Sequence, residues 1–257
     1  MTSPVLENGL LVLLGLLPSL VWLFFFYKRD SHPEPKYLIS KTFLMGILIA
    51  PLAVILQLIL VSLGDMLSLD FLSQGTATFF VWAAFVEESV KLLCVQIIVL
   101  RSPEFDEPVD AMIYMITAAL GFAAIENILF MFKVVPQANL LYLFKVDSHQ
   151  AQIAISIWAL RFTGATLLHA LSSALLGYFL AVSWFYQHHK KKLIVIGLAM
   201  ATLFHATFNI FLSSFENQQT GLLLSDLVLV IMALMVFILF SKIKERHNKL
   251  LATATLA

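Results

Sequence analysis

Charged residues are scarce in this chain. Asp, Glu, Lys and Arg make up 12% of the 257 residues, whereas 60% are hydrophobic. A soluble domain carries about 25% charged and about 45–50% apolar residues, so the composition excludes an ordinary soluble protein. The net charge is zero, which leaves no basic surface for nucleic acid. The single cysteine, Cys94, excludes an intramolecular disulfide and a cysteine-rich zinc site.

The apolar stretches are much longer than transmembrane β-strands of roughly 9–11 residues. They predict an all-α polytopic membrane protein, a bundle of about seven transmembrane helices forming one integral-membrane domain over residues 1–257. The fifth stretch exceeds about 25 residues, the upper end for one span, so we expect a helical irregularity near Gly164. The predicted spans are 8–27, 42–63, 76–100, 110–132, 156–186, 193–213 and 221–241.

Basic residues gather in alternate connections, which predicts the orientation because cytoplasmic loops are enriched in Lys and Arg. The opposite side carries only Lys133 and Lys145, with Arg161 expected to reach outward to the interface. We therefore expect the N-terminus outside and the C-terminus in the cytoplasm. The residues on the cytoplasmic side are Lys28, Arg29, Lys36, Lys41, Arg101, Lys190, Lys191, Lys192, Lys242, Lys244, Arg246 and Lys249.

Four of the predicted spans contain polar groups that a membrane helix normally lacks. An ionisable residue at bilayer depth costs roughly 2.5–3.5 kcal/mol, so such residues usually face the bundle interior and mark a function. The helical rise of about 1.5 Å per residue places all four groups in one slab near the bilayer middle. The groups are Glu87, Glu88 and Lys91; Glu126 and Asn127; His169; and His205 and Asn209.

The spacing within these groups suggests shared helix faces. Glu87 and Lys91 are four residues apart, which allows them to pair. His205 and Asn209 have the same spacing, which suits an imidazole oriented by an amide or two donors to one oxyanion. Each group also has a structural explanation, namely a buried ion pair or an interhelical hydrogen bond that fixes packing. Their joint occurrence at one depth favours a functional site.

Three segments resemble the PrsW family of intramembrane proteases, which is distantly similar to the CAAX-protease and bacteriocin-processing group. Glu87-Glu88-Ser89-Val90-Lys91 resembles the family's EExxK motif. The segments 105–111 and 121–127 resemble its F-x-E-P-x-D-G and GFA-x-x-EN block, with Ala111 in place of the usual glycine. His169 and His205 match the two later histidine motifs. The resemblance covers roughly residues 10–241.

The resemblance implies hydrolysis of a peptide bond in or near the membrane segment of a single-span regulatory protein, such as an anti-sigma factor, in the inner membrane of a bacterial-type cell. It implies supporting roles for Lys91, Asn127 and Phe122. Its implied catalytic residues are Glu87, Glu88, Glu126, His169, His205 and Asn209.

Two mechanisms stay open at this point. In the slightly preferred metal-free version, Glu87 or Glu88 takes a proton from water, and His205 with Asn209 stabilises the oxyanion. In the other version, zinc is held by His169, His205 and a carboxylate such as Glu126. The chain lacks a compact H-E-x-x-H helix, so metal ligands would come from separate helices.

Two other protein classes use similar residues. A proton- or ion-coupled transporter also places Glu, Lys and His within its spans, although the chain has no inverted repeat. A non-catalytic membrane scaffold would use the same groups only for packing.

Overall fold

The computed structural model describes residues 4–29, 32–134, 155–156, 158–215 and 217–254. Within these ranges the chain is helical, without a strand. Lys145, assigned above to the outer side, lies outside the described residues. The elements are α1 (Pro4–Tyr27), α2 (Lys36–Leu67), η1 (Asp70–Leu72), α3 (Ala77–Ile98), α4 (Asp110–Val134), η2 (Arg161–Ala165), α7 (Thr166–Phe185), η3 (Gln187–His189), α8 (Lys190–Ser214) and α9 (Gln218–Ala254).

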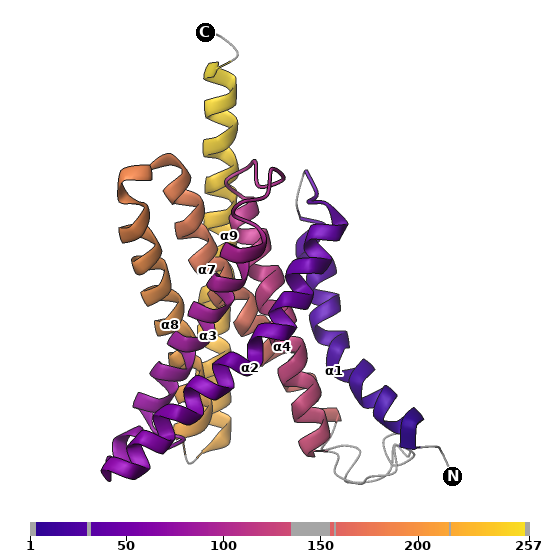
Figure 1. The fold of residues 1–257 in the computed structure, drawn as a ribbon, viewed down its shortest axis with the longest axis vertical. Coiled ribbons are helices and arrows are strands. Elements are labelled where there is room, and N and C mark those ends of the chain that lie inside the picture. Colours follow the sequence, from indigo (N-terminus) through magenta and orange to yellow (C-terminus); the bar gives the residue numbers. More distant parts are fainter. Residues whose placement is uncertain (1–3, 30–31, 135–154, 157, 216, 255–257) are drawn as a thin grey trace.

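Seven long helices form an elongated bundle, with the N-terminus at one end and the C-terminus at the other (Figure 1). Six of them, with the stretch before α7 counted as part of that helix, are long and apolar enough to cross a membrane. The seventh, α3, has 22 residues, enough for a rise of roughly 33 Å, but it carries Glu87, Glu88 and Lys91. The predicted all-α polytopic fold is confirmed.

The helices extend past several predicted ends. α2 has 32 residues and runs obliquely through the bundle, consistent with the tilt that a long helix adopts in a bilayer (Figure 1). α9 continues to Ala254, 13 residues beyond the predicted end of its span, and projects beyond the other helices at the C-terminal end (Figure 1). The predicted spans end where polar side chains interrupt the apolar run. The helices continue because their backbone hydrogen bonds do not depend on the polarity of the side chains.

α4 and α7 form the centre of the bundle. In their apolar windows 67% and 72% of the residues are buried, compared with 22–33% in the other four candidate spans. Small residues bring the neighbouring backbones close. A methyl group at Gly121 of α4 would overlap the carbonyl oxygen of Phe43 in α2, and one at Gly177 of α7 would lie 2.8 Å from the carbonyl oxygen of Ala111. Gly177 thus allows α7 to approach the start of α4 closely.

The irregularity expected near Gly164 is a π-helical turn, η2, directly before α7. A π turn inserts an extra residue and changes the direction in which the preceding side chains point. Gly164 is buried within it. η2 therefore sets the orientation of Arg161 relative to the residues on α4.

Candidate active site

Four helices bring their polar side chains into one buried cluster, which we call the polar site. α3 provides Glu87, Glu88 and Lys91, and α4 provides Glu126, while α7 and α8 provide His169 and His205. Hydrogen bonds and close ion pairs connect all six residues. The four groups, for which the sequence indicated only a common depth, thus also converge laterally.

Glu88 is completely buried, and four donors hold its carboxylate. Its Oε1 accepts hydrogen bonds from Lys91 Nζ at 2.8 Å, His205 Nδ1 at 2.9 Å and Ser172 Oγ at 2.9 Å. Its Oε2 accepts one from Ser173 Oγ at 2.7 Å. A carboxylate satisfied in this way fixes its neighbours in place and has little capacity left to receive a proton from water.

His169 lies between Lys91 and Glu126. The Lys91 ammonium lies 2.8 Å from Nδ1 of His169, and Glu126 Oε2 lies 2.9 Å from Nε2. Because an ammonium has only donors, Nδ1 must accept; Nε2 therefore carries the proton and donates it to the carboxylate. Glu126 thus fixes both the tautomer and the orientation of this ring.

His205 has the mirror arrangement. Its Nδ1 donates to Glu88, which leaves Nε2 of the neutral ring as an acceptor. That nitrogen faces Glu87 Oε2 at 3.6 Å. The two imidazoles pack edge to face, with ring centroids 5.0 Å apart and planes at 85°. Each histidine therefore donates from one nitrogen to a carboxylate, Glu126 for His169 and Glu88 for His205. The other nitrogen of each ring faces Glu87.

Glu87 occupies that centre. Gln57 of α2 donates to its Oε1 at 3.1 Å, whereas its buried Oε2 has no hydrogen-bond partner among the described residues. This oxygen lies 3.7 Å from His169 Nδ1 and 3.8 Å from Lys91 Nζ. A buried carboxyl oxygen without a partner is costly inside a bundle, so it marks a place where a ligand or reactant would bind.

Glu126, Asn127 and Arg161 form the outer wall of the polar site. Arg161 donates from Nε to Asn127 Oδ1 at 2.7 Å and lies 3.6 Å from Glu126, while Asn127 donates to Thr166 at 2.9 Å. The expectation that Arg161 reaches outward to the interface was wrong, because the buried carboxylate and amide attract the guanidinium inward. The side chain of Glu126 is 32% exposed, so the polar site is most accessible here.

Phe122 and Asn209 are the two remaining predicted residues. Phe122 is buried, its ring centroid lying 4.8 Å from Lys91 Nζ and 5.7 Å from the His169 ring, so it supports both. Asn209 is half-buried one turn after His205 and has no hydrogen-bond partner among the described residues. The structure therefore places Asn209 next to the polar site but does not connect it to the network.

Three residues of the polar site could hold a metal ion. One ligand atom each from Glu87, His169 and His205 lies within 4.8 Å of the others. This set differs from the predicted His169, His205 and Glu126, because Glu126 lies on the outer side of the His169 ring.

The donor set fits a divalent cation. Both histidines turn an acceptor nitrogen to the centre and donate from the other nitrogen to a carboxylate, as zinc-binding histidines do. With three carboxylates and the two cations Lys91 and Arg161, the formal charge is 2 − 3 = −1, which a bound cation would offset. The one opposing feature is the Lys91 ammonium on His169 Nδ1.

Sequence reasoning missed Gln57 and the inward position of Arg161. Both are polar residues within apolar stretches, which was the signal available for them. Gln57 holds one oxygen of Glu87, and Arg161 holds Asn127 and lies beside Glu126.

The chain is similar in sequence to known proteins over most of its length. The chain is 27% identical over 204 residues to Protease PrsW of Oceanobacillus iheyensis, covering 79% of this chain and 83% of the relative. It is 25% identical over 208 residues to Protease PrsW of Bacillus subtilis, with the same coverage, and 34% identical over 122 residues to that of Geobacillus kaustophilus, covering 47% of this chain and 52% of the relative. No solved structure matches significantly. A sequence model described as PrsW family intramembrane metalloprotease matches residues 34–240, and the chain therefore belongs to this family.

Proposed function

We propose that this protein is an endopeptidase that hydrolyses a peptide bond in or near the membrane segment of a single-span regulatory protein, of the kind that anti-sigma factors represent. Family membership supports peptide-bond hydrolysis within a membrane. The central observation is that His169 and His205 both direct an acceptor nitrogen toward the unpartnered oxygen of Glu87. Such a group of two imidazoles and a carboxylate can hold a metal ion or activate water.

The geometry favours the metal-dependent version. Glu87, His169 and His205 would hold zinc through Oε2, Nδ1 and Nε2. A zinc ion supplies Lewis-acid activation of water and of a carbonyl oxygen. Glu88 and Glu126 orient the two imidazoles, and Lys91 offsets the buried charge of Glu88. This version requires that Lys91 Nζ leave His169 Nδ1, and its 2.8 Å contact with Glu88 Oε1 could remain.

The contact between Lys91 and His169 supports a second, metal-free version. There the ammonium occupies the inner nitrogen of His169, and Glu87 Oε2 acts as the general base for a water molecule. His205 Nε2 lies next to that oxygen, and Asn209, one turn further along α8, would stabilise the oxyanion. Both versions assign the central role to Glu87 and a positioning role to Glu88.

We also propose that residues 1–257 act as one membrane domain, with the N-terminus outside the inner membrane and the C-terminus in the cytoplasm. The basic ends of α1, α9 and the α7–α8 connection lie at the same end of the bundle (Figure 1). That end would face the cytoplasm by the positive-inside rule.

The test compares membrane-protein fragments in host cells that make the native chain or Glu87→Gln at equal abundance. Fragments that end near a membrane span and require Glu87 would establish proteolysis and identify the substrate. Glu245→Gln is the matched control, because Glu245 is an exposed glutamate near the end of α9. Identical fragments under several envelope stresses, together with coupled ion flux in sealed vesicles, would instead support a transporter.

The zinc content of the purified protein distinguishes the metal-dependent version from the metal-free version. Zinc bound per purified chain should approach one in the native protein and fall in His205→Ala, while His188→Ala, which replaces an exposed histidine, should keep it. A native protein that is active yet retains no zinc after dialysis against a chelator would support the metal-free version.

A further inference from the structure

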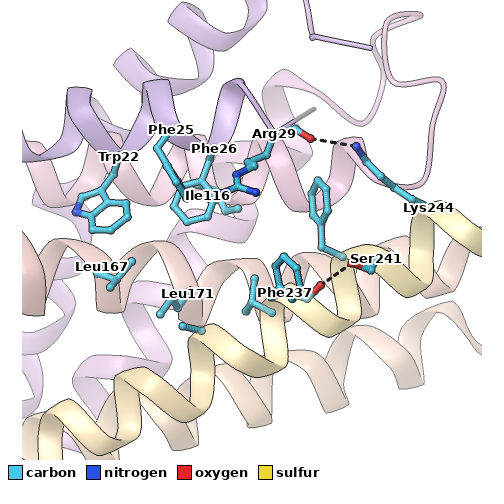
Figure 2. A pocket seen from close by; sticks show the side chains of 13 residues that line it. Trp22, Phe25, Phe26, Arg29, Ile116, Leu167, Leu171, Phe237, Ser241 and Lys244 are labelled. Atoms are coloured by element: carbon cyan, nitrogen blue, oxygen red, sulfur yellow. Dashed lines mark hydrogen bonds between the residues drawn. The ribbon is translucent and has the colours of Figure 1, made fainter. Parts of the chain in front are cut away.

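A cavity lies on the face of α7 away from the polar site. It has a volume of about 480 Å³ and is bounded by α1, α4, α7 and α9 (Figure 2). Leu167 and Leu171 line it, and His169 lies two residues from each, about 200° around the helix. The cavity and the polar site therefore occupy opposite sides of α7.

Five of the 13 residues that line the cavity are aromatic. Trp22, Phe25 and Phe26 come from α1, and Phe237 and Phe240 come from α9 (Figure 2). A helix about 10 Å wide would fill this volume with roughly one turn, so the space suits something thinner than a helix. An acyl chain of a membrane lipid has the required width and apolar character.

The rim of the cavity is basic. Arg29 and Lys244 lie there together with Ser241, and no acidic residue occurs among the described residues that line the cavity. Lys244 Nζ donates to the carbonyl oxygen of Arg29 at 3.1 Å and lies 4.9 Å from the Phe240 ring centroid (Figure 2). The Lys244 ammonium is thus held next to the backbone of Arg29, at the end of the bundle where the basic loops gather (Figure 1). An anion has charge complementarity with this rim.

We propose that this cavity binds an anionic phospholipid, with one acyl chain against the aromatic wall and the phosphate between Arg29 and Lys244. Basic pockets between transmembrane helices bind the headgroups of such lipids, and arginine pairs well with phosphate oxygens. The bilayer supplies this ligand at high concentration next to the opening. A fatty acid lacks the phosphate and the second chain that the surrounding bilayer would hold.

Trp22, at the inner end of the cavity, connects the cavity to the π-helical turn η2. Trp22 lines the cavity and donates from Nε1 to the carbonyl oxygen of Phe162 at 2.9 Å. Phe162 belongs to η2, the turn that carries Arg161. A bound acyl chain packs against Trp22 and secures α1 against η2, so lipid binding should raise the unfolding temperature.

The experiment is native mass spectrometry of the purified full chain in detergent, titrated separately with phosphatidylglycerol and phosphatidylcholine. The native chain should retain one phosphatidylglycerol molecule preferentially. In Arg29→Gln/Lys244→Gln its affinity should fall about thirtyfold, as expected for the loss of two basic contacts to an anionic headgroup. Lys190→Gln/Lys242→Gln is the matched control, because these exposed lysines lie at the same end outside the cavity.

A second pair of variants tests the apolar part. Ala233→Phe places a ring into the cavity and should abolish retention, whereas Leu234→Phe adds a ring on the exposed side of the same helix and should preserve it. Thermal unfolding without added lipid identifies a variant that fails to fold. The lipid-dependent rise in unfolding temperature should appear only with the native chain and the control variants.

Equal retention of both phospholipids, or an unchanged affinity in the Arg29 and Lys244 variant, would overturn the proposal. Retention of palmitate but not of phosphatidylglycerol would overturn it as well, because the phosphate would then play no part. Lipid binding does not depend on peptide hydrolysis, so Glu87→Gln should bind phosphatidylglycerol normally. A failure of the lipid proposal would therefore leave the proposed peptidase activity untouched, and the reverse also holds.

Discussion

Glu88 of α3 accepts a hydrogen bond from His205 Nδ1 of α8 at 2.9 Å, in a position where both side chains are buried. This contact assigns different roles to two adjacent glutamates. Glu88 directs Nε2 of the imidazole toward Glu87 Oε2, and Glu87 keeps an oxygen without a partner among the described residues. In the proposed mechanism, Glu88 therefore orients and Glu87 reacts, and the two are neighbours about 100° apart on one helix.

The first prediction concerns Glu87→Gln. Activity should fall at least about 10²-fold, because the variant loses either a proposed zinc ligand or a positioned acid–base group, which contributes about 10²–10⁴-fold. Stability should change little, because Glu87 Oε2 makes no hydrogen bond that the amide would lose. Peptidase assays and thermal unfolding of the same preparation check both parts. Full activity with a normal unfolding temperature would remove Glu87 from the mechanism.

Glu88→Gln, in contrast to Glu87→Gln, should lower the stability of the protein. The amide loses a buried charge that pairs with Lys91 and is a weaker acceptor for the proton of His205, so the unfolding temperature should fall. Zinc affinity should fall about 10–100-fold, as when an outer partner of a ligating histidine is changed. Competition with a chelating dye measures the affinity, with Glu245→Gln as the control. An unchanged affinity would show that His205 does not need Glu88 for its orientation.

The sequence predicted the helices well because an apolar run of about 20 residues has few alternatives in a membrane. It predicted the members of the polar site because ionisable residues are rare there and therefore conspicuous. It did not separate the roles of Glu87 and Glu88, since adjacent residues differ only in helix rotation. That rotation depends on how α3 packs against α2, α7 and α8, as the contacts with Gln57, Ser173 and His205 show.

The candidate metal ligands were also predicted only in part from the sequence. Depth along the helices made Glu126 a reasonable partner for the histidines, but the ring of His169 lies between Glu126 and the centre of the polar site. Arg161 was placed outward because a long side chain can reach the interface. The π turn and the acceptors on α4 direct it inward instead. Neither result follows from spacing, because both depend on contacts between helices.

Lys91→Met should destabilise the protein strongly. It leaves the carboxylate of Glu88 buried without its cation, and breaking a buried pair costs about 3–5 kcal/mol. Adding Glu88→Gln should recover part of this loss, since the uncompensated charge is removed. A double-mutant cycle in unfolding free energy measures the coupling. Simple addition of the two single effects would mean that the pair contributes no coupling energy.

Gly121→Ala should destabilise the bundle by about 1–3 kcal/mol, the usual cost of overpacking. The added methyl group overlaps backbone atoms of α2, which cannot move aside as a flexible side chain can. Gly9→Ala is the matched control, because a methyl group there meets nothing within 4 Å. Thermal unfolding in detergent compares the two. Equal unfolding temperatures would mean that α2 and α4 do not pack at this distance.

Asn209→Ala tests the oxyanion role proposed for α8. Asn209 lies one turn from His205, is half-buried, and has no hydrogen-bond partner among the described residues, so its amide is available to a substrate. Removing such a donor should lower kcat about 10²–10³-fold and leave KM nearly unchanged, because the interaction forms only as charge develops on the carbonyl oxygen. Unfolding should be unaffected, since no hydrogen bond within the described residues is lost. A rise in KM at constant kcat would instead assign Asn209 to substrate binding in the ground state.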